Sequence, residues 1–206
     1  MSMSPVESDD VMLAMVSPHA YWLLREWRRH AFGDLMTSRQ ALEGVRQQIL
    51  AAGAKEGVLR GASVTVRTKG LWSTFHKAVV RHQKVNDVLA VRVVLRKGLQ
   101  GEECFDASDV MRNMWATQPG RHKDYVSAPK TNGYQALHDT MLLPSGHSFE
   151  VQIRSHLMHQ HAEFGPAAHR RYKGALLDLP MTILSGVAFR PPRDPFSAAF
   201  GSALAA

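Results

Sequence analysis

Hydrophobic residues recur along the chain with two different periods, and each period predicts a different kind of element. Spacings of three or four residues predict helices at 19–32, 38–53, 71–81, 104–116 and 155–173. Alternating or continuous apolar runs predict strands at 63–69, 87–95, 136–143 and 147–154, the last two joined as a hairpin. The strand at 87–95 is nearly all apolar, which is typical of an interior strand. Helices and strands interleave, so the pattern predicts an α+β domain with a mixed sheet.

Three segments lack a clear hydrophobic period. Residues 1–17 are predicted to be a loose lead-in, and residues 117–135, rich in Pro, Gly, Asn and Lys, a long loop of the kind that often carries function. The last residues, Pro-rich and then small, are predicted to be poorly ordered. We therefore divide the chain into a lead-in with one helix (1–35), a main domain (36–176) and a tail (177–206).

Composition narrows the class of protein. The 206 residues are 45% hydrophobic and 21% charged, which is ordinary for a soluble globular domain. No apolar run approaches the ~18 residues of a membrane span, and a single cysteine excludes an internal disulfide framework. The first ten residues are acidic, which argues against a targeting peptide. We expect a cytoplasmic protein, or one of the organelle stroma if the source bears plastids.

The charge balance favours anionic partners. Lys and Arg number 25 against 18 Asp and Glu, a formal net charge of +7. Such an excess suits nucleotides, phosphates or nucleic acid, and it is equally compatible with a basic surface that serves only solubility.

The segment EVQIR places three polar groups on one face of a strand. Glu150, Gln152 and Arg154 alternate with Val151 and Ile153. A carboxylate, an amide and a guanidinium in a row suit a cleft that holds a metal ion and a polyphosphate. The alternative is an ordinary strand whose polar face lies in water.

Two charged residues mark the apolar strand at 87–95. Asp87 is the first residue of this strand and could share Mg²⁺ with Glu150 if the two strands are neighbours. The alternative is that Asp87 only forms the turn that precedes the strand. Arg92, inside the strand, needs a partner or a cleft. The two residues are five apart, so strict alternation puts them on opposite faces unless a bulge or a late strand start intervenes.

Two further segments are rich in cations. In RTKGLWSTFHK, the residues Arg67, Lys69, Ser73 and Lys77 surround a strand-to-helix junction that suits a triphosphate, although such clusters are usually solvated. The loop from 120 to 138 adds a turn at Asn132-Gly133 and an aromatic ring amid lysines, Tyr134, that could stack on a base or lie in the core. The histidines at 156, 159 and 161 do not share one helical face, and a zinc site is not expected.

These motifs occur in an order that closely resembles the synthetase domain of the RelA/SpoT family, which makes the alarmone (p)ppGpp. The resemblance rests on RTK…S…K, DVLAVRVV, GRHKDYVSAPKTNGYQALH, EVQIR and MHQHAEFGPAAHRRYK, from Arg67 to Lys173. Four positions depart from the family pattern: Val66, Ala78, Asp139 and Arg170.

The resemblance implies a nucleotidyltransferase-like mixed sheet that transfers pyrophosphate from ATP to the 3′-hydroxyl of GDP or GTP. It implies that Asp87 and Glu150 are catalytic and hold Mg²⁺, with Glu150 a candidate base. The implied ATP ligands are Arg67, Lys69, Ser73, Lys77 and Arg92. The implied acceptor ligands are Lys123, Lys130, Asn132, Tyr134, His138, Gln152, Arg154 and His159.

Two other functions remain as alternatives. The same fold could act on another acceptor, an adenine nucleotide or a tRNA 3′ end, which Arg25, Arg28 and Arg29 of the first predicted helix could contact. A second alternative is a catalytically silent module that binds nucleotides or RNA. In the main interpretation the partners are ATP and GDP or GTP; nucleic acid is not required. The assembly state, including a homo-oligomer, and the choice between a stand-alone enzyme and a fragment of a longer one stay open.

Overall fold

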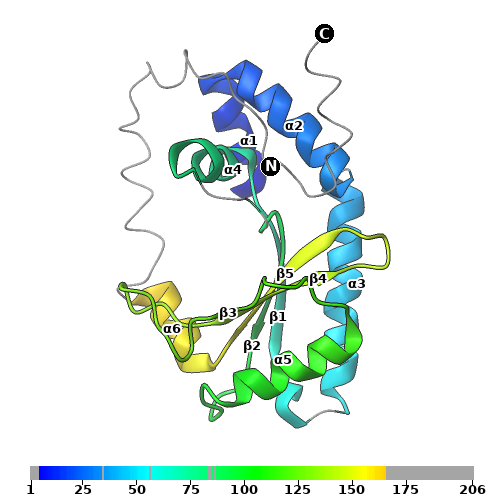
Figure 1. Cartoon of the computed structure of the whole chain (residues 1–206), viewed down its shortest axis with the longest axis vertical. Helices are drawn as coiled ribbons and strands as arrows, with labels where there is room; N and C mark the ends of the chain where they lie inside the picture. Colours follow the sequence, from blue (N-terminus) through cyan, green and yellow to red (C-terminus); the bar gives the residue numbers. More distant parts are fainter. Residues whose placement is uncertain (1–4, 34, 56, 83–84, 86, 166–206) are drawn as a thin grey trace. The chain divides into compact units, whose positions relative to one another are not determined.

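The computed structural model describes residues 5–33, 35–55, 57–82, 85 and 87–165, and these residues fall into two compact units (Figure 1). The first unit comprises residues 5–38 and 68–88, and the second comprises residues 39–67 and 89–165, with the gaps just given. Each unit is described by itself.

The second unit is built on a five-stranded mixed sheet. Its strands are β1 (Ser63–Thr68), β2 (Leu89–Val94), β3 (Lys123–Asp124), β4 (Leu137–Leu142) and β5 (Ser148–Arg154), in the order β1-β2-β5-β4-β3. β2 runs parallel to β5, whereas β4 pairs antiparallel with both β5 and β3. The predicted α+β class, the hairpin and the interior position of the 87–95 strand are confirmed.

The helices are divided between the two units. The second unit contains α3 (Leu35–Gly53, whose first residues belong to the first unit), the 3₁₀ turn η1 (Gly57–Leu59), α5 (Glu103–Met114) and α6 (His156–Phe164). The first unit contains α1 (Pro5–Val16), α2 (Pro18–Phe32), α4 (Leu71–Phe75) and the π-helical turn η2 (His76–Val80). Helix α2 begins one residue before the predicted start at His19, because Ser17 caps it and Pro18 occupies its first turn.

The two faces of the sheet differ in chemistry. Val91, Val93, Val151 and Ile153 are fully buried on the face that α5 covers, where Trp115 meets Phe149 edge to face at 5.7 Å between ring centroids. Alternation turns the residues between them to the opposite face. That face carries the polar side chains described below.

Several predicted boundaries are wrong. Residues 5–16 form α1 rather than a loose lead-in, because Asp9 and Asp10 bond to the backbone of α4. Helix α3 begins at Leu35 rather than at the predicted residue 38, and the hydroxyl of Ser38, inside the helix, donates to the carbonyl oxygen of Phe32.

Two other predicted segments differ in part. The predicted helix at 71–81 divides into α4 and η2, and the predicted loop at 117–135 contains β3. The predicted tail and the part of the 155–173 helix beyond Gly165 lie outside the described residues.

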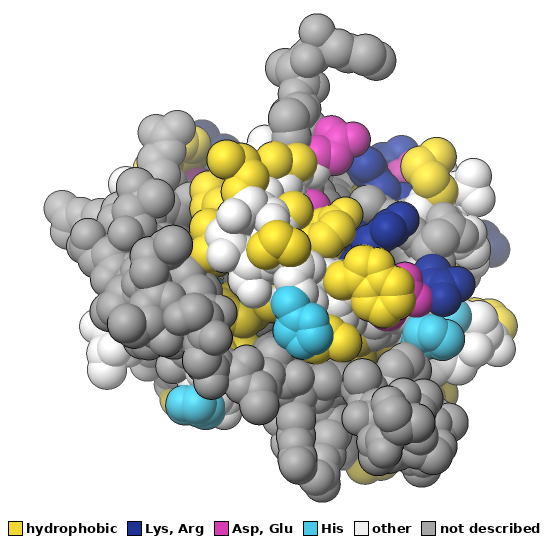
Figure 2. All heavy atoms as spheres, turned by 90° about the horizontal axis from the view of Figure 1, so that it is seen from above, with side chains coloured by type: hydrophobic (Ala, Val, Ile, Leu, Met, Phe, Trp, Pro, Cys, Tyr) yellow, Lys and Arg dark blue, Asp and Glu magenta, His cyan; other side chains and the backbone are white. Residues whose placement is uncertain are grey.

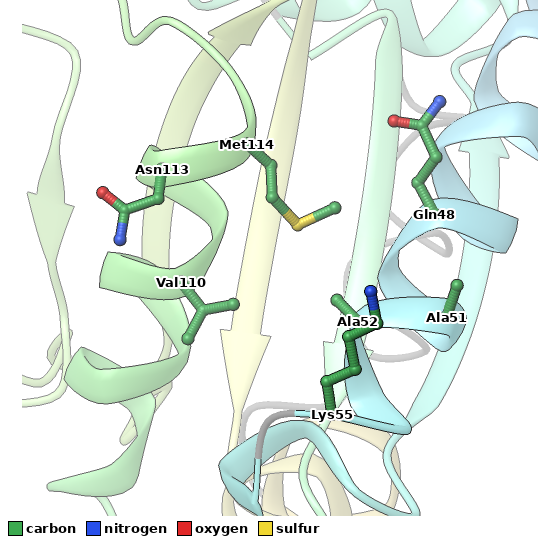
Figure 3. A pocket seen from close by; sticks show the side chains of 7 residues that line it. All are labelled: Gln48, Ala51, Ala52, Lys55, Val110, Asn113 and Met114. Carbon is green, nitrogen blue, oxygen red and sulfur yellow. The ribbon is translucent and has the colours of Figure 1, made fainter.

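Two surface features include none of the predicted site residues. A cavity of about 490 Å³ opens between α3 and α5, into which Val110 and Met114 point from α5 (Figure 3). On α1 and α2, Met15 and Trp22 are the most exposed large hydrophobic side chains, and hydrophobic side chains gather on the face seen in Figure 2. None of the helices in the described ranges is both long and apolar enough to cross a membrane.

Candidate active site

The strand register brings the predicted polar residues into rows on one face of the sheet. Arg92 of β2 lies opposite Gln152 of β5, which lies opposite His138 of β4, and His138 in turn lies opposite Lys123 of β3. Opposed residues on neighbouring strands point to the same face, so these four side chains form one row across four strands. Glu150 lies one row away, opposite Ala90 and Thr140. We call Arg92, His138, Glu150, Gln152 and Arg154 the polar sheet face.

The polar sheet face is buried at His138, Glu150 and Arg154, half-buried at Arg92 and Gln152, and internally hydrogen-bonded, which makes the solvated-strand alternative wrong. Glu150 is 7% exposed and Arg154 is 3% exposed. Gln152 Nε2 donates to Glu150 Oε1 at 2.7 Å, and Arg154 Nη2 lies 3.4 Å from Gln152 Oε1. The predicted shared face of these three residues is confirmed.

A second path joins Arg154 to Glu150 through Tyr134, a residue of the loop at 120–138 that we call the acceptor loop. Arg154 Nη2 donates to the hydroxyl of Tyr134 at 2.6 Å, and that hydroxyl lies 2.8 Å from Nε2 of His138. Nδ1 of His138 lies 3.3 Å from Oε1 of Glu150. The same arginine therefore reaches the same carboxylate by two routes.

Arg154 at one end and Glu150 at the other fix the direction of hydrogen-bond donation along both routes. A guanidinium can only donate and an ionised carboxylate can only accept. Tyr134 accepts from Arg154, so its own proton is available for Nε2 of His138, and burial raises the pKa of Tyr134 so that this proton is retained near neutral pH. In the neutral imidazole the proton then lies on Nδ1, facing Glu150. The network orients the carboxylate and holds it as an acceptor.

Buried arginine nitrogens without hydrogen-bond partners face this region. Nε of Arg92, together with Nε and Nη1 of Arg154, have no hydrogen bond among the described residues. Burial lowers the pKa of Arg92, and the charges of Arg154 and Arg67 lower it further, whereas Glu163 raises it. Glu163 of α6 is the acid that reaches both arginines, at 2.8 Å from Arg92 and 3.7 Å from Arg154. Unfilled donors beside mutually repelling cations suit a polyanionic ligand.

The acceptor loop adds aromatic rings and a lysine. The turn predicted at Asn132-Gly133 is confirmed: Asn132 Oδ1 accepts from the amide of Tyr134 at 3.2 Å, and Gly133 has φ of +77°. Nζ of Lys130 lies 4.4 Å from the ring centroid of Tyr125 and 4.9 Å from that of Tyr134. The remaining predicted acceptor ligand is His159 of α6, whose Nδ1 lies 3.9 Å from Oε1 of Glu163.

The first unit contains a separate group, the lysine–aspartate cluster of Lys69, Lys77 and Asp87. Nζ of Lys69 lies 2.6 Å from one carboxylate oxygen of Asp87, and Nζ of Lys77 lies 2.8 Å from the other. Burial opposes the ionised form, but the two ammonium groups outweigh it and hold the pKa of Asp87 well below its usual range. β2 begins at Leu89, so Asp87 precedes the strand and the predicted conflict with Arg92 is removed by a late strand start.

Helix α1 supplies two carboxylates that the sequence interpretation missed. Asp10 Oδ1 accepts from the amide of Leu71 at 2.7 Å, and Asp9 Oδ2 accepts from the amide of Ser73 at 3.0 Å. They cap the first turn of α4, which has no cap from its own Gly70. Asp10 also pairs with Arg28 at 2.8 Å. Pro5 followed by acidic residues was the available signal for a helix start.

Gly70 is required by this capping. A side chain there would overlap the carboxylate carbon of Asp9, at 2.6 Å from an added Cβ. We expect Gly70→Ala to lower the free energy of unfolding by about 1–3 kcal/mol, measured by urea denaturation. In an Asp9→Gly background, which removes both the Cβ and the carboxylate of Asp9, the cost of the same substitution should fall to a few tenths of a kcal/mol. Equal costs in both backgrounds would contradict this account.

Oxygen ligands for Mg²⁺ are present in both units. Asp87 is ionised, as a metal ligand must be, and Glu150 presents a hydrogen-bonded carboxylate. Among the residues that the structure describes, no three His, Cys, Asp or Glu side chains are grouped to hold a metal alone. Mg²⁺ typically takes one or two carboxylates together with phosphate oxygens, so each of these two carboxylates by itself has the chemistry of a Mg²⁺ ligand whose site a nucleotide would complete.

Comparison with known proteins assigns the family. A model described as "Region found in RelA / SpoT proteins" matches residues 66–176, just over half of the chain. The chain belongs to the RelA/SpoT family. This RelA/SpoT chain is 40% identical over 124 residues to a rice protein, "Probable GTP diphosphokinase RSH3, chloroplastic", covering 59% of this chain and 17% of that protein.

It is also 32% identical over 174 residues to the bifunctional (p)ppGpp synthase/hydrolase SpoT of Escherichia coli, covering 81% of this chain and 23% of that protein. The chain thus spans about a third or less of the curated relatives it matches.

Solved structures share the fold of the RelA/SpoT chain. Small alarmone synthetase 1 of Bacillus subtilis, bound to its product pppGpp, superposes with a TM-score of 0.56 at 20% identity, covering 77% of this chain and 86% of that one. Small alarmone synthetase 2 of the same organism gives a TM-score of 0.55 at 19% identity, covering 73% and 85%. The nucleotidyltransferase-like α+β fold is therefore that of the small alarmone synthetases.

Proposed function

We propose that this chain catalyses Mg²⁺-dependent transfer of pyrophosphate from ATP to the 3′-hydroxyl of GDP or GTP, producing (p)ppGpp. The observation that carries the proposal is the buried polar sheet face, where arginine donors without partners lie beside an oriented carboxylate. Membership of the RelA/SpoT family and the names of the relatives support the same reaction.

The lysine–aspartate cluster and Ser73 are assigned to ATP in this proposal. Lys69 and Lys77 would exchange their contacts with Asp87 for contacts with phosphate oxygens, which leaves Asp87 available as a ligand of Mg²⁺. The family resemblance implies that Glu150 is a ligand of Mg²⁺ as well. Mg²⁺, when bound, neutralises charge on the transferred phosphates. Arg67 and Arg92 are assigned to the adenine ring, as the family resemblance implies.

Glu150 is assigned to the acceptor hydroxyl. In the step proposed, the 3′-oxygen forms a bond to the β-phosphorus of ATP, the bond from that phosphorus to the α-bridging oxygen breaks, and AMP leaves. The hydroxyl proton passes to Glu150, whose carboxylate His138 and Gln152 hold in place. Most of the rate enhancement would come from positioning and charge stabilisation.

Tyr134 is assigned to the guanine base. Tyr134→Ala is expected to weaken binding of GDP by about 1–3 kcal/mol, measured by calorimetry, because it removes an aromatic stack. Tyr134→Phe should lose much less, since it keeps the ring and gives up only the hydroxyl contacts with Arg154 and His138. Equal losses for both variants would assign the effect to the hydroxyl and contradict stacking.

An acceptor panel tests the proposal as a whole. The chain is incubated with labelled ATP, Mg²⁺ and, in turn, GDP, GTP, ADP and tRNA, and the products are separated by chromatography. We expect label on GDP or GTP only. Label on ADP or tRNA would change the acceptor, and no transfer to any acceptor would identify a silent binding module. For a tRNA acceptor, Arg25 and Arg29 are the helix arginines to replace, because both are exposed, whereas Arg28 is half-buried against Asp10.

The name of one relative bears on the cellular compartment in which this chain would act. The rice relative is named chloroplastic, so an organelle stroma stands beside the cytoplasm as the compartment where the reaction would occur.

A further inference from the structure

Asp139 is a buried carboxylate that the proposed chemistry does not use. It is 3% exposed and lies on the sheet face opposite His138, toward α5. Ser108 Oγ donates to its Oδ2 at 2.6 Å, while Nη2 of Arg112 and Nδ1 of His122 both lie 2.9 Å from its Oδ1. Burial would raise the pKa of Asp139, but these hydrogen bonds outweigh it and lower that pKa. Asp139 is therefore ionised and joins three partners that are distant in sequence.

One of these partners belongs to the segment that leads into β3. Because Lys123 lies opposite His138 in an antiparallel pair, His122 lies beside Asp139. Lys123 and His122 alternate, so the contact of His122 with Asp139 on one face directs Lys123 to the other, where His138 and the polar sheet face lie. A shift of one residue in the register of β3 on β4 would turn Lys123 away from the polar sheet face and His122 toward it.

The backbone alone holds this register weakly. β3 has only two residues, followed by one further hydrogen bond from the amide of Tyr125 to the carbonyl oxygen of Ala136, at 3.0 Å. Before β3, Thr117 lies opposite Met141. From Thr117 to Lys123 the chain advances six residues, whereas the opposing stretch of β4, from Met141 to His138, advances only three. Three extra residues are therefore accommodated beside Asp139. Asp139 is placed at the point where the register changes.

We propose that Asp139 is a positioning residue for the acceptor nucleotide, which fixes the register of β3 on β4 through His122 and thereby holds Lys123 on the acceptor face. This inference rests on the proposed function for the identity of the acceptor. The contact that carries it lies wholly within the second unit.

Separate variants distinguish this role from general stabilisation of the sheet. Asp139→Asn and His122→Ala both weaken the contact to the loop, whereas Ser108→Ala removes only a contact to α5 and serves as the matched control. We expect the first two to raise KM for GDP about tenfold, with KM for ATP and kcat changed by less than about twofold to threefold. Ser108→Ala should lower Tm and leave both KM values unchanged.

A second substitution tests whether Lys123 transmits the effect. In a Lys123→Ala background, Asp139→Asn should change KM for GDP by less than twofold, because the group that Asp139 positions is already gone. Full additivity of the two substitutions would overturn the inference, and so would an equal rise of both KM values in Asp139→Asn.

Hydrogen exchange of the ligand-free protein provides a readout that needs no activity. The amide of Tyr125 should exchange at least tenfold faster in Asp139→Asn and His122→Ala than in the wild type, and at the wild-type rate in Ser108→Ala. Unchanged protection of Tyr125 would overturn the role of Asp139 whatever the acceptor is. Faster exchange together with no binding of GDP to the wild type would instead uphold the register contact and overturn the proposed acceptor.

Discussion

Glu150→Gln is expected to reduce (p)ppGpp synthesis by at least about 100-fold while leaving the fold unchanged. Glutamine keeps the shape of the side chain and can still accept from Gln152, but it cannot take the 3′-hydroxyl proton and adds no negative charge for Mg²⁺. The measurement is kcat with GDP and ATP saturating, accompanied by circular dichroism.

Glu43→Gln is the matched control for this substitution. Glu43 is a half-exposed glutamate of α3 whose partners are Arg46 and Gln47 on the same helix, so its loss should change kcat by less than about twofold. A Glu150→Gln variant that keeps near wild-type kcat would remove Glu150 from the chemistry.

Asp87→Asn is expected to remove synthesis to a similar extent and to destabilise the first unit as well. It leaves Lys69 and Lys77 without their shared counter-charge, which should lower the free energy of unfolding by about 3 kcal/mol. Asp106→Asn, at an exposed aspartate of α5, is the matched control and should change neither quantity measurably.

The free energy of unfolding measured at acid pH tests this second prediction further. The pKa of Asp87 is lowered in the folded protein, so its contribution to stability is fully present above the unfolded value of about 3.9 and is lost as pH falls below it. The stability advantage of the wild type over Asp87→Asn should therefore be large at pH 7 and should shrink below pH 4. An advantage that does not depend on pH would show that the ion pairs are not its source.

The polar sheet face could be predicted because strand alternation is a local property of sequence. Once EVQIR is a strand, Glu150, Gln152 and Arg154 must share a face, and the resemblance to a known family supplied the residues of neighbouring strands. The hydrogen-bonded turn at Asn132-Gly133 was predictable for a similar reason, since asparagine and glycine favour that backbone locally.

The features that the sequence did not reveal depend on contacts between distant residues. Helix α1 has little amphipathic pattern, and its position against α4 depends on Asp9 and Asp10 reaching amides more than 60 residues away. The partners of Asp139 lie 17 to 31 residues away, so no local period indicates them. Asp139 was visible only as a departure from the family pattern, and its contacts came from the structure.

The position of the transferred phosphates tests the central claim most directly. ATP labelled at the α-phosphate and ATP labelled at the β-phosphate are each incubated with the chain, Mg²⁺ and GDP, and the labelled products are identified. Pyrophosphate transfer predicts that the β-label moves to the guanosine product and that the α-label remains in AMP. Transfer of the α-label to the acceptor, or formation of ADP in place of AMP, would contradict the proposed reaction.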